Sequence, residues 1–171
     1  MTTHNTLDAI IVEDSPPDRL RMRLLLNTIS VSHRFAWNAE TNRVIDSSLV
    51  IKMLKHYIPK RLVIDLAWSV EDDRQITELR FKGIDQIKDI EKAHEDKQWI
   101  SGIHLIDTLV QTIDEEFIDE LDKIVIVSKY IPPVSYGLRE FLAEKLENIP
   151  NVSFSFVTKW SEEHRFKDIM L

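Results

Sequence analysis

The stretch Arg61–Trp68, RLVIDLAW, decides how this sequence folds. Its first four residues, Arg61 to Ile64, form a continuous run without polar alternation, which is typical of a strand buried on both faces. Asp65 follows this run directly. A carboxylate at the end of a buried strand is costly unless its charge is compensated. The stretch therefore predicts an inner strand that ends in an acid with a special role.

Other apolar runs alternate with segments of helical periodicity along the rest of the chain. Strands that alternate with helices predict an α/β protein, with a parallel sheet covered by helices on both faces. Besides Arg61–Trp68, we expect strands over 8–14, 33–40, 122–130 and 152–160, and helices over 15–30, 47–57, from near Gly102, over 135–146 and over 162–170.

The first expected helix carries clear signals at its start. Ser15 is suited to the N-cap and Pro16 to the first turn. The apolar side of this helix is expected to comprise Leu20, Met22, Leu24, Leu25, Leu26 and Ile29.

Composition limits the class of protein. The 171 residues fit one domain, and we expect the whole of 1–171 to be that domain. A formal net charge of −7 argues against nucleic acid as the main partner. The absence of cysteine fits a reducing cytoplasm and excludes thiolate sites. No apolar run is long enough to span a membrane, and the N-terminal residues do not resemble a signal peptide.

A charged segment over 70–100 interrupts the alternation of strands and helices. Residues 71–97 contain nine acidic and six basic residues, with no strand pattern. We expect a largely helical insertion whose apolar stripe either packs on the domain itself or binds a partner; a disordered loop is the remaining alternative. The stripe comprises Ile76, Leu79, Ile84, Ile87 and Ile90.

Polar residues follow several of the expected strands at the point where each strand ends. Because the carboxyl ends of parallel strands meet at one edge of a sheet, these side chains are expected to converge there. Carboxylates that converge repel one another and favour a divalent cation, and ligands that are all oxygen favour Mg²⁺. A nearby lysine and serine could bind phosphoryl oxygens. The residues are Glu13, Asp14, Asp65, Ser128 and Lys159.

Four segments together, IIVEDS, LVIDLAW, IVIVSKY and FSFVTKW, resemble the receiver domain of two-component response regulators. The resemblance covers residues 7–68 and 101–171. It implies a doubly wound, flavodoxin-like sheet of five parallel strands in the order 2-1-3-4-5, with the charged insertion between strand 3 and helix 3. It also implies that Asp65 accepts a phosphoryl group, and that Mg²⁺ is held by Glu13, Asp14, Asp65 and the backbone carbonyl of Ala67. The resemblance further matches Lys159 to the strand-five lysine of the family and Ser128 to its strand-four hydroxyl position. Ser128 and Phe156, at the aromatic switch position, are the residues expected to switch.

The function implied by this resemblance is that of a stand-alone receiver, or a piece of a longer protein, in a cytoplasmic phosphorelay. Its expected partners are a sensor histidine kinase or phosphotransfer protein, a downstream protein and a second copy of itself. The sequence departs from the family where Trp160 follows Lys159 and where the insertion replaces a short loop. These departures keep open a second reading, a receiver-like interaction module that works without phosphorylation.

A third reading, a Mg²⁺-dependent phosphatase with an aspartate nucleophile, lacks a required group. Such enzymes need a general acid two residues beyond the nucleophile, and Ala67 occupies that position. We therefore expect a phosphoryl acceptor and not a turnover enzyme.

Overall fold

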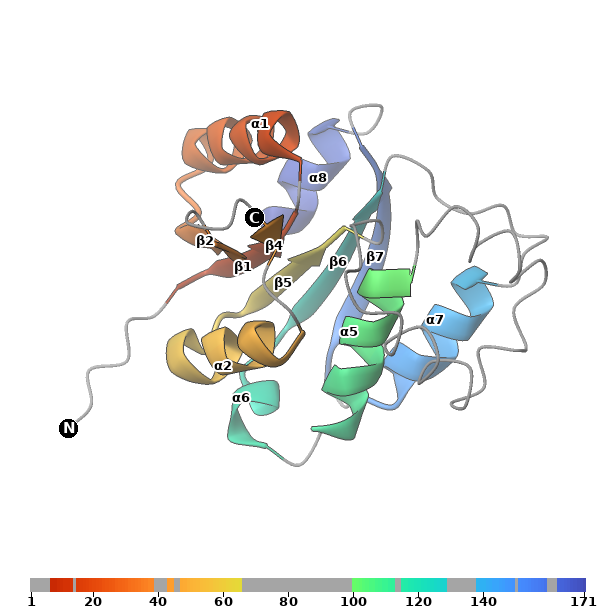
Figure 1. The fold of residues 1–171 in the computed structure, drawn as a ribbon. Helices are drawn as coiled ribbons and strands as arrows, with labels where there is room; N and C mark the ends of the chain where they lie inside the picture. The colour runs from red at the N-terminus through yellow and green to blue at the C-terminus, as the bar shows by residue number, and fades with distance from the viewer. Residues whose placement is uncertain are drawn as a thin grey trace.

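A five-stranded parallel sheet forms the centre of the molecule (Figure 1). The computed structural model describes residues 7–13, 15–38, 43–44, 47–65, 100–112, 115–128, 138–149, 151–159 and 163–171. The strand order is β2-β1-β5-β6-β7, which is the order 2-1-3-4-5 expected from the resemblance. Its strands are β1 (Ala9–Val12), β2 (His33–Phe35), β5 (Arg61–Ile64), β6 (Lys123–Ser128) and β7 (Ser153–Thr158).

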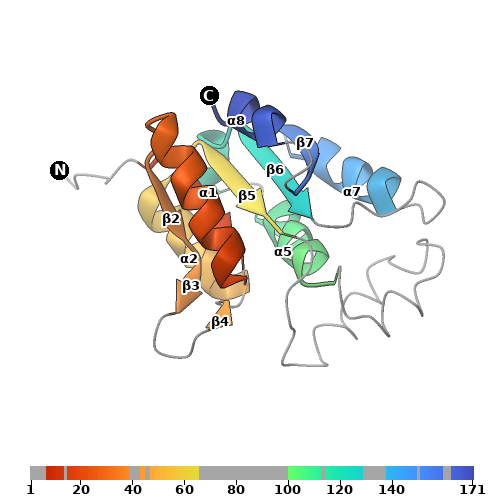
Figure 2. The same ribbon diagram turned by 90° about the horizontal axis from the view of Figure 1, so that it is seen from above.

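Helices cover both faces of the sheet, as predicted from the alternating pattern (Figure 1). In Figure 2, α1 and α8 lie on the near side of the sheet. The helices α2, α5 and α7 lie on the other face, and the short helix α6 precedes β6. The bounds are α1 Pro16–Thr28, α2 Ser47–Tyr57, α5 Ile100–Gln111, α6 Glu116–Asp119, α7 Leu138–Glu147 and α8 Glu163–Met170.

The inner strands alternate between two apolar cores. In β1, Ile10 and Val12 belong to the core beneath α2, α5 and α7, whereas Ala9 and Ile11 belong to the core beneath α1 and α8. All four side chains are fully buried. This burial on both faces explains why the strands read as continuous apolar runs rather than as alternating patterns.

Helix α1 begins and ends with recognisable local signals. Ser15 is the N-cap in an extended conformation, but its side chain does not cap the helix, and proline occupies the first turn. At the other end Ser30 has a φ of 56°, and the N–H of Val31 donates to the carbonyl of Leu26 at 3.1 Å. This is a Schellman-type ending with serine at the left-handed position that glycine normally occupies.

The predicted apolar side of α1 was only partly correct. Met22, Leu25 and Leu26 are buried against the sheet, but Leu20 and Leu24 are 56% and 58% exposed. The apolar residues of this helix span more than one face, and only one face can meet the sheet.

The second predicted strand was too long. Strand β2 ends at Phe35, and after Ala36 the segment β3 (Trp37–Asn38) pairs antiparallel with β4 (Arg43–Val44) in a separate small sheet. Helix α5 begins at Ile100, slightly before the predicted start near Gly102, and α6 was not predicted. None of the described helices is long and apolar enough to cross a membrane.

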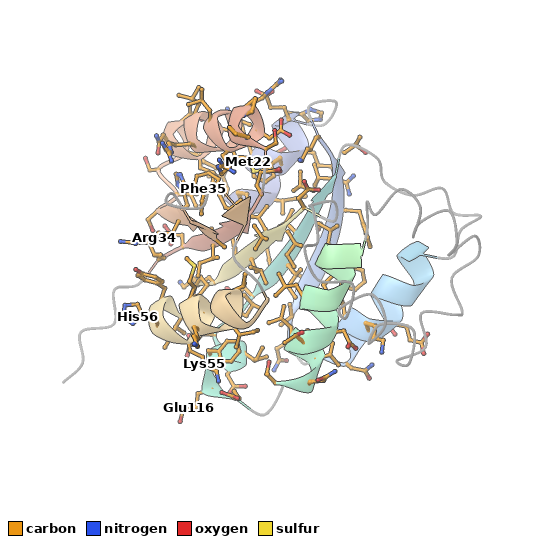
Figure 3. The ribbon with its side chains drawn as sticks, in the orientation of Figure 1. Met22, Arg34, Phe35, Lys55, His56 and Glu116 are labelled. Atoms are coloured by element: carbon orange, nitrogen blue, oxygen red, sulfur yellow. The ribbon has the colours of Figure 1, made fainter. Side chains whose placement is uncertain are left out.

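Two side-chain contacts involve the last turn of α2. The guanidinium of Arg34 in β2 lies 4.8 Å from the ring centroid of Tyr57 in α2. Lys55 of α2, which Figure 3 labels, approaches the carboxylate of Glu115 at the start of α6 to 2.8 Å. These contacts lie away from the carboxyl ends of β5 and β6, which form the edge where the candidate site is found.

Candidate functional site

Two acids and a lysine meet at the carboxyl edge of the sheet. Glu13 directly follows β1, Asp65 follows β5 and Lys159 follows β7. The parallel strands place all three at the same edge, which the arrowheads of β5 and β6 mark in Figure 1. All three residues are buried, although each carries an ionisable group. Such a buried cluster can form only if its charges compensate one another.

Lys159 is the cation that compensates the acids. Its ammonium nitrogen lies 2.9 Å from Oδ2 of Asp65 and 2.5 Å from Oε2 of Glu13. It also lies 3.1 Å from Oδ2 of Asp18, in the first turn of α1. An ammonium group has three N–H donors, and here it faces three carboxylates from three different elements.

Local structure fixes Glu13 at the start of the loop between β1 and α1. The backbone N–H of Ser15 donates to Oε1 of Glu13 at 3.0 Å. The guanidinium of Arg19 donates to the backbone carbonyl of Glu13 at 3.1 Å. Arg19 is itself buried, so this contact lies inside the fold. The first turns of α1 therefore position the acid that follows β1.

Burial and mutual repulsion perturb the ionisation of the site. Burial, together with the nearby charge of Asp65, raises the pKa of Glu13 to about 8. Burial on its own would lower the pKa of Lys159, but the carboxylates of Asp65 and Glu13 outweigh it and raise that pKa above its usual value. Lys159 is therefore a permanent cation, and the negative charge of Glu13 is disfavoured by its surroundings.

Asp18 is a site residue that the sequence analysis missed. The available signal was its position in the first turn of a helix that starts directly after the acidic end of β1. A carboxylate in a first helical turn is normally explained by the helix dipole, so it gave no reason to expect a contact with Lys159. The two residues are 141 positions apart in sequence, and only the fold brings them together.

Comparison with known proteins identifies the fold. No protein-family model and no curated protein matches the sequence of this chain. Among solved structures, the chain is similar to a CheY-like response regulator receiver domain protein from Methanospirillum hungatei JF-1, with a TM-score of 0.53 and 8% identity over 96% of this chain and 90% of that chain. The chain has the receiver fold. A response regulator from Thermotoga maritima is similar to the same extent, with a TM-score of 0.50 and 13% identity over 96% of this chain and 98% of that chain.

The other residues expected in the site of a receiver are only partly described. Ser128 is the last residue of β6 and pairs with Thr158 of β7, so its backbone lies at the same edge as Lys159. Phe156 is buried, and its ring packs edge-on against Phe154 with 6.0 Å between centroids. Asp14, Ala67 and the predicted insertion up to residue 99 lie outside the described residues.

The described acids have the chemistry that Mg²⁺ requires. Glu13 and Asp65 offer carboxylate oxygens, the ligands that this ion prefers. Oε2 of Glu13 is buried and, although it forms an ion pair with Lys159, makes no hydrogen bond of ordinary geometry to any described residue. A divalent cation would satisfy this oxygen and offset the burial and the repulsion by Asp65 that raise the pKa of Glu13. Within the described ranges, no cluster of three or more acids or histidines is arranged to hold a metal.

Proposed function

We propose that this chain is a response-regulator receiver that accepts a phosphoryl group on Asp65 from a histidine kinase or phosphotransfer protein. The observation that carries the proposal is the buried contact between Lys159 and Asp65, 2.9 Å long, beside Glu13 at the carboxyl edge of a receiver fold. A carboxylate oriented by a lysine and placed beside a second acid is suited to in-line attack on phosphorus with the help of a metal ion.

Each site residue has a proposed role in this reaction. Glu13, Asp14, Asp65 and the carbonyl of Ala67 would hold Mg²⁺, and the ion would supply positive charge for the phosphoryl oxygens. Lys159 pairs with Asp65 before transfer and with a phosphoryl oxygen afterwards. Ser128 donates to another phosphoryl oxygen, and Phe156 changes position with it. The signal then passes on through altered protein–protein contacts.

The proposed partners follow from the same role. We assign 1–171 to one receiver domain with an insertion over 70–100, whose apolar stripe would bind a kinase, a downstream protein or a second copy of the chain. The position of this insertion directly after Asp65 would let it report the state of the site. A reducing cytoplasm is the compartment that suits this role and the cysteine-free sequence.

The proposal is tested by incubation with Mg²⁺ and acetyl phosphate, followed by intact-mass measurement. The wild type should gain one phosphoryl group, and the gain should disappear without Mg²⁺. Asp65→Asn should gain none, whereas Asp119→Asn, the same change at an exposed aspartate of α6, should gain as much as the wild type.

One observation favours the alternative of an interaction module that works without phosphorylation. Lys159 lies between Glu13 and Asp65, closer to the former, so the protein already carries a cation where the two acids converge. A wild type that remains unmodified with several small phosphodonors, and whose thermal stability does not respond to Mg²⁺, would support this alternative.

A further inference from the structure

Asp18 adds a third carboxylate to the site. Its position in the first turn of α1 does not by itself explain why it contacts Lys159. Its Oδ2 atom accepts a hydrogen bond from the ammonium of Lys159 at 3.1 Å, while Asp65 accepts another at 2.9 Å. The ammonium also forms an ion pair with Glu13 at 2.5 Å. Two of the three N–H groups of Lys159 therefore already donate to Asp18 and Asp65, and a phosphoryl oxygen would compete with these acids for the same cation.

The surroundings of Asp18 identify it as the outer member of the cluster. Its side chain is 19% exposed, compared with 3% for Lys159. Because Asp18 and Asp65 contact the same nitrogen, a phosphoryl group on Asp65 would lie within a few ångströms of the Asp18 carboxylate. The modification would also increase the negative charge at this point, since an acyl phosphate carries more charge than the carboxylate it replaces.

We propose that Asp18 is a positioning residue that holds Lys159 in the unphosphorylated arrangement and shortens the lifetime of the phosphoryl group on Asp65. This inference rests on the proposed function and names a determinant of how long the signal lasts. Asp18 acts in two ways, because it competes for a donor of Lys159 and because its charge repels the phosphoryl oxygens. Both effects destabilise the phosphorylated state relative to the unphosphorylated one.

The steps affected are the gain and the loss of the phosphoryl group. In the gain, an oxygen of Asp65 forms a bond to phosphorus while the bond between phosphorus and the donor oxygen breaks, and acetate leaves with the electron pair. In the loss, water attacks phosphorus, the Asp65 carboxylate leaves, and inorganic phosphate and a proton are released. Asp18 makes no bond in either step.

The test compares the phosphoryl lifetime in variants of the whole chain. Wild type, Asp18→Asn, Asp18→Glu and Asp119→Asn are labelled with acetyl phosphate and Mg²⁺, the donor is removed, and the labelled fraction is followed by intact mass. Asp18→Asn keeps the size of the side chain but removes its charge, and its half-life should rise by about tenfold at low salt. Asp18→Glu restores the charge and should return the half-life to near the wild-type value. Asp119→Asn should match the wild type.

Ionic strength separates this effect from a structural one. The increase in phosphoryl half-life caused by Asp18→Asn should shrink as NaCl rises from about 0.05 to 0.5 M. Salt screens the charge repulsion that this substitution removes. Asp18→Thr serves as a second neutral variant if Asp18→Asn melts well below the wild type. If the wild type is labelled normally but the half-life is unchanged or shortened in the neutral variants, the inference about Asp18 is overturned and the proposed function stands. A wild type that takes up no phosphoryl group overturns the proposed function, and this inference with it.

Discussion

The stability of the metal-free protein should fall as pH rises from about 5 to 8, and Glu13→Gln should remove most of this fall. In the folded protein the pKa of Glu13 is raised from its ordinary 4.5 to about 8 by burial and by the charge of Asp65. Between these two values the folded protein holds a proton that the unfolded chain has already lost. Stability contributed by that proton is therefore present at low pH and is lost as pH rises through the window.

The size of the effect follows from the separation of the two pKa values. At about 1.4 kcal/mol for each pH unit, the full separation corresponds to about 5 kcal/mol. Water entry and local relaxation on ionisation reduce such penalties. We therefore expect the wild type to lose about half of this value in free energy of unfolding. Glu13→Gln should avoid the loss, because glutamine has no charge to bury. Glu13→Gln should match the wild type near pH 5 and exceed its free energy of unfolding by ~2–3 kcal/mol near pH 8.5.

Urea unfolding in metal-free buffer measures this difference. Wild type and Glu13→Gln are unfolded at half-unit steps from pH 5 to 8.5, with Glu144→Gln, an exposed position on α7, as the matched control. The control should follow the wild type at every pH. A constant difference between Glu13→Gln and wild type across the range would show that Glu13 does not titrate there. A variant less stable than wild type at pH 8.5 would refute the reasoning outright.

Three further outcomes are expected. Lys159→Met should lower the free energy of unfolding by ~3 kcal/mol near neutral pH, because the buried carboxylate of Asp65 loses its cation. A loss below about 1 kcal/mol in urea unfolding would contradict this. Ser30→Gly should raise stability by ~1 kcal/mol, since glycine adopts the φ of 56° without a Cβ penalty, and a lowered melting temperature would count against it. Mg²⁺ should raise the melting temperature more at pH 8 than at pH 6, because metal binding requires ionised Glu13; equal shifts in calorimetry would argue that Glu13 is not a ligand.

The sheet was largely predictable from sequence, because burial on both faces leaves a direct trace in the residues. The runs that became β1, β5 and β6 are continuous and apolar, and they end at the polar residues that mark the edge of the sheet. Strand β2 was less predictable because its alternating pattern continues beyond Phe35. The chain leaves the main sheet there to pair with β4, and no local signal distinguishes a residue of one sheet from a residue of the other.

The site residues that directly follow strands could be predicted from the sequence. Glu13, Asp65 and Lys159 converge because parallel strands share one edge. Asp18 could not be found in this way, because its contact depends on how α1 is rotated over the sheet. The same rotation exposes Leu20 and buries Arg19, contrary to their polarity. Helix rotation is set by tertiary packing, and a helix with apolar residues on several faces does not reveal it.

The contacts of Lys159 also constrain when the fold can form. They join this residue to Asp65 across 94 positions and to Asp18 across 141. A growing chain that has not yet emerged beyond β6 would bury Glu13 and Asp65 at the carboxyl edge without their cation, and it would leave the β7 side of β6 unpaired. Both costs oppose closure of a partial sheet, so the sheet should become stable only when its last strand arrives. Lys159 thus makes folding of the central sheet nearly all-or-none, and a chain truncated before β7 should remain open to proteolysis.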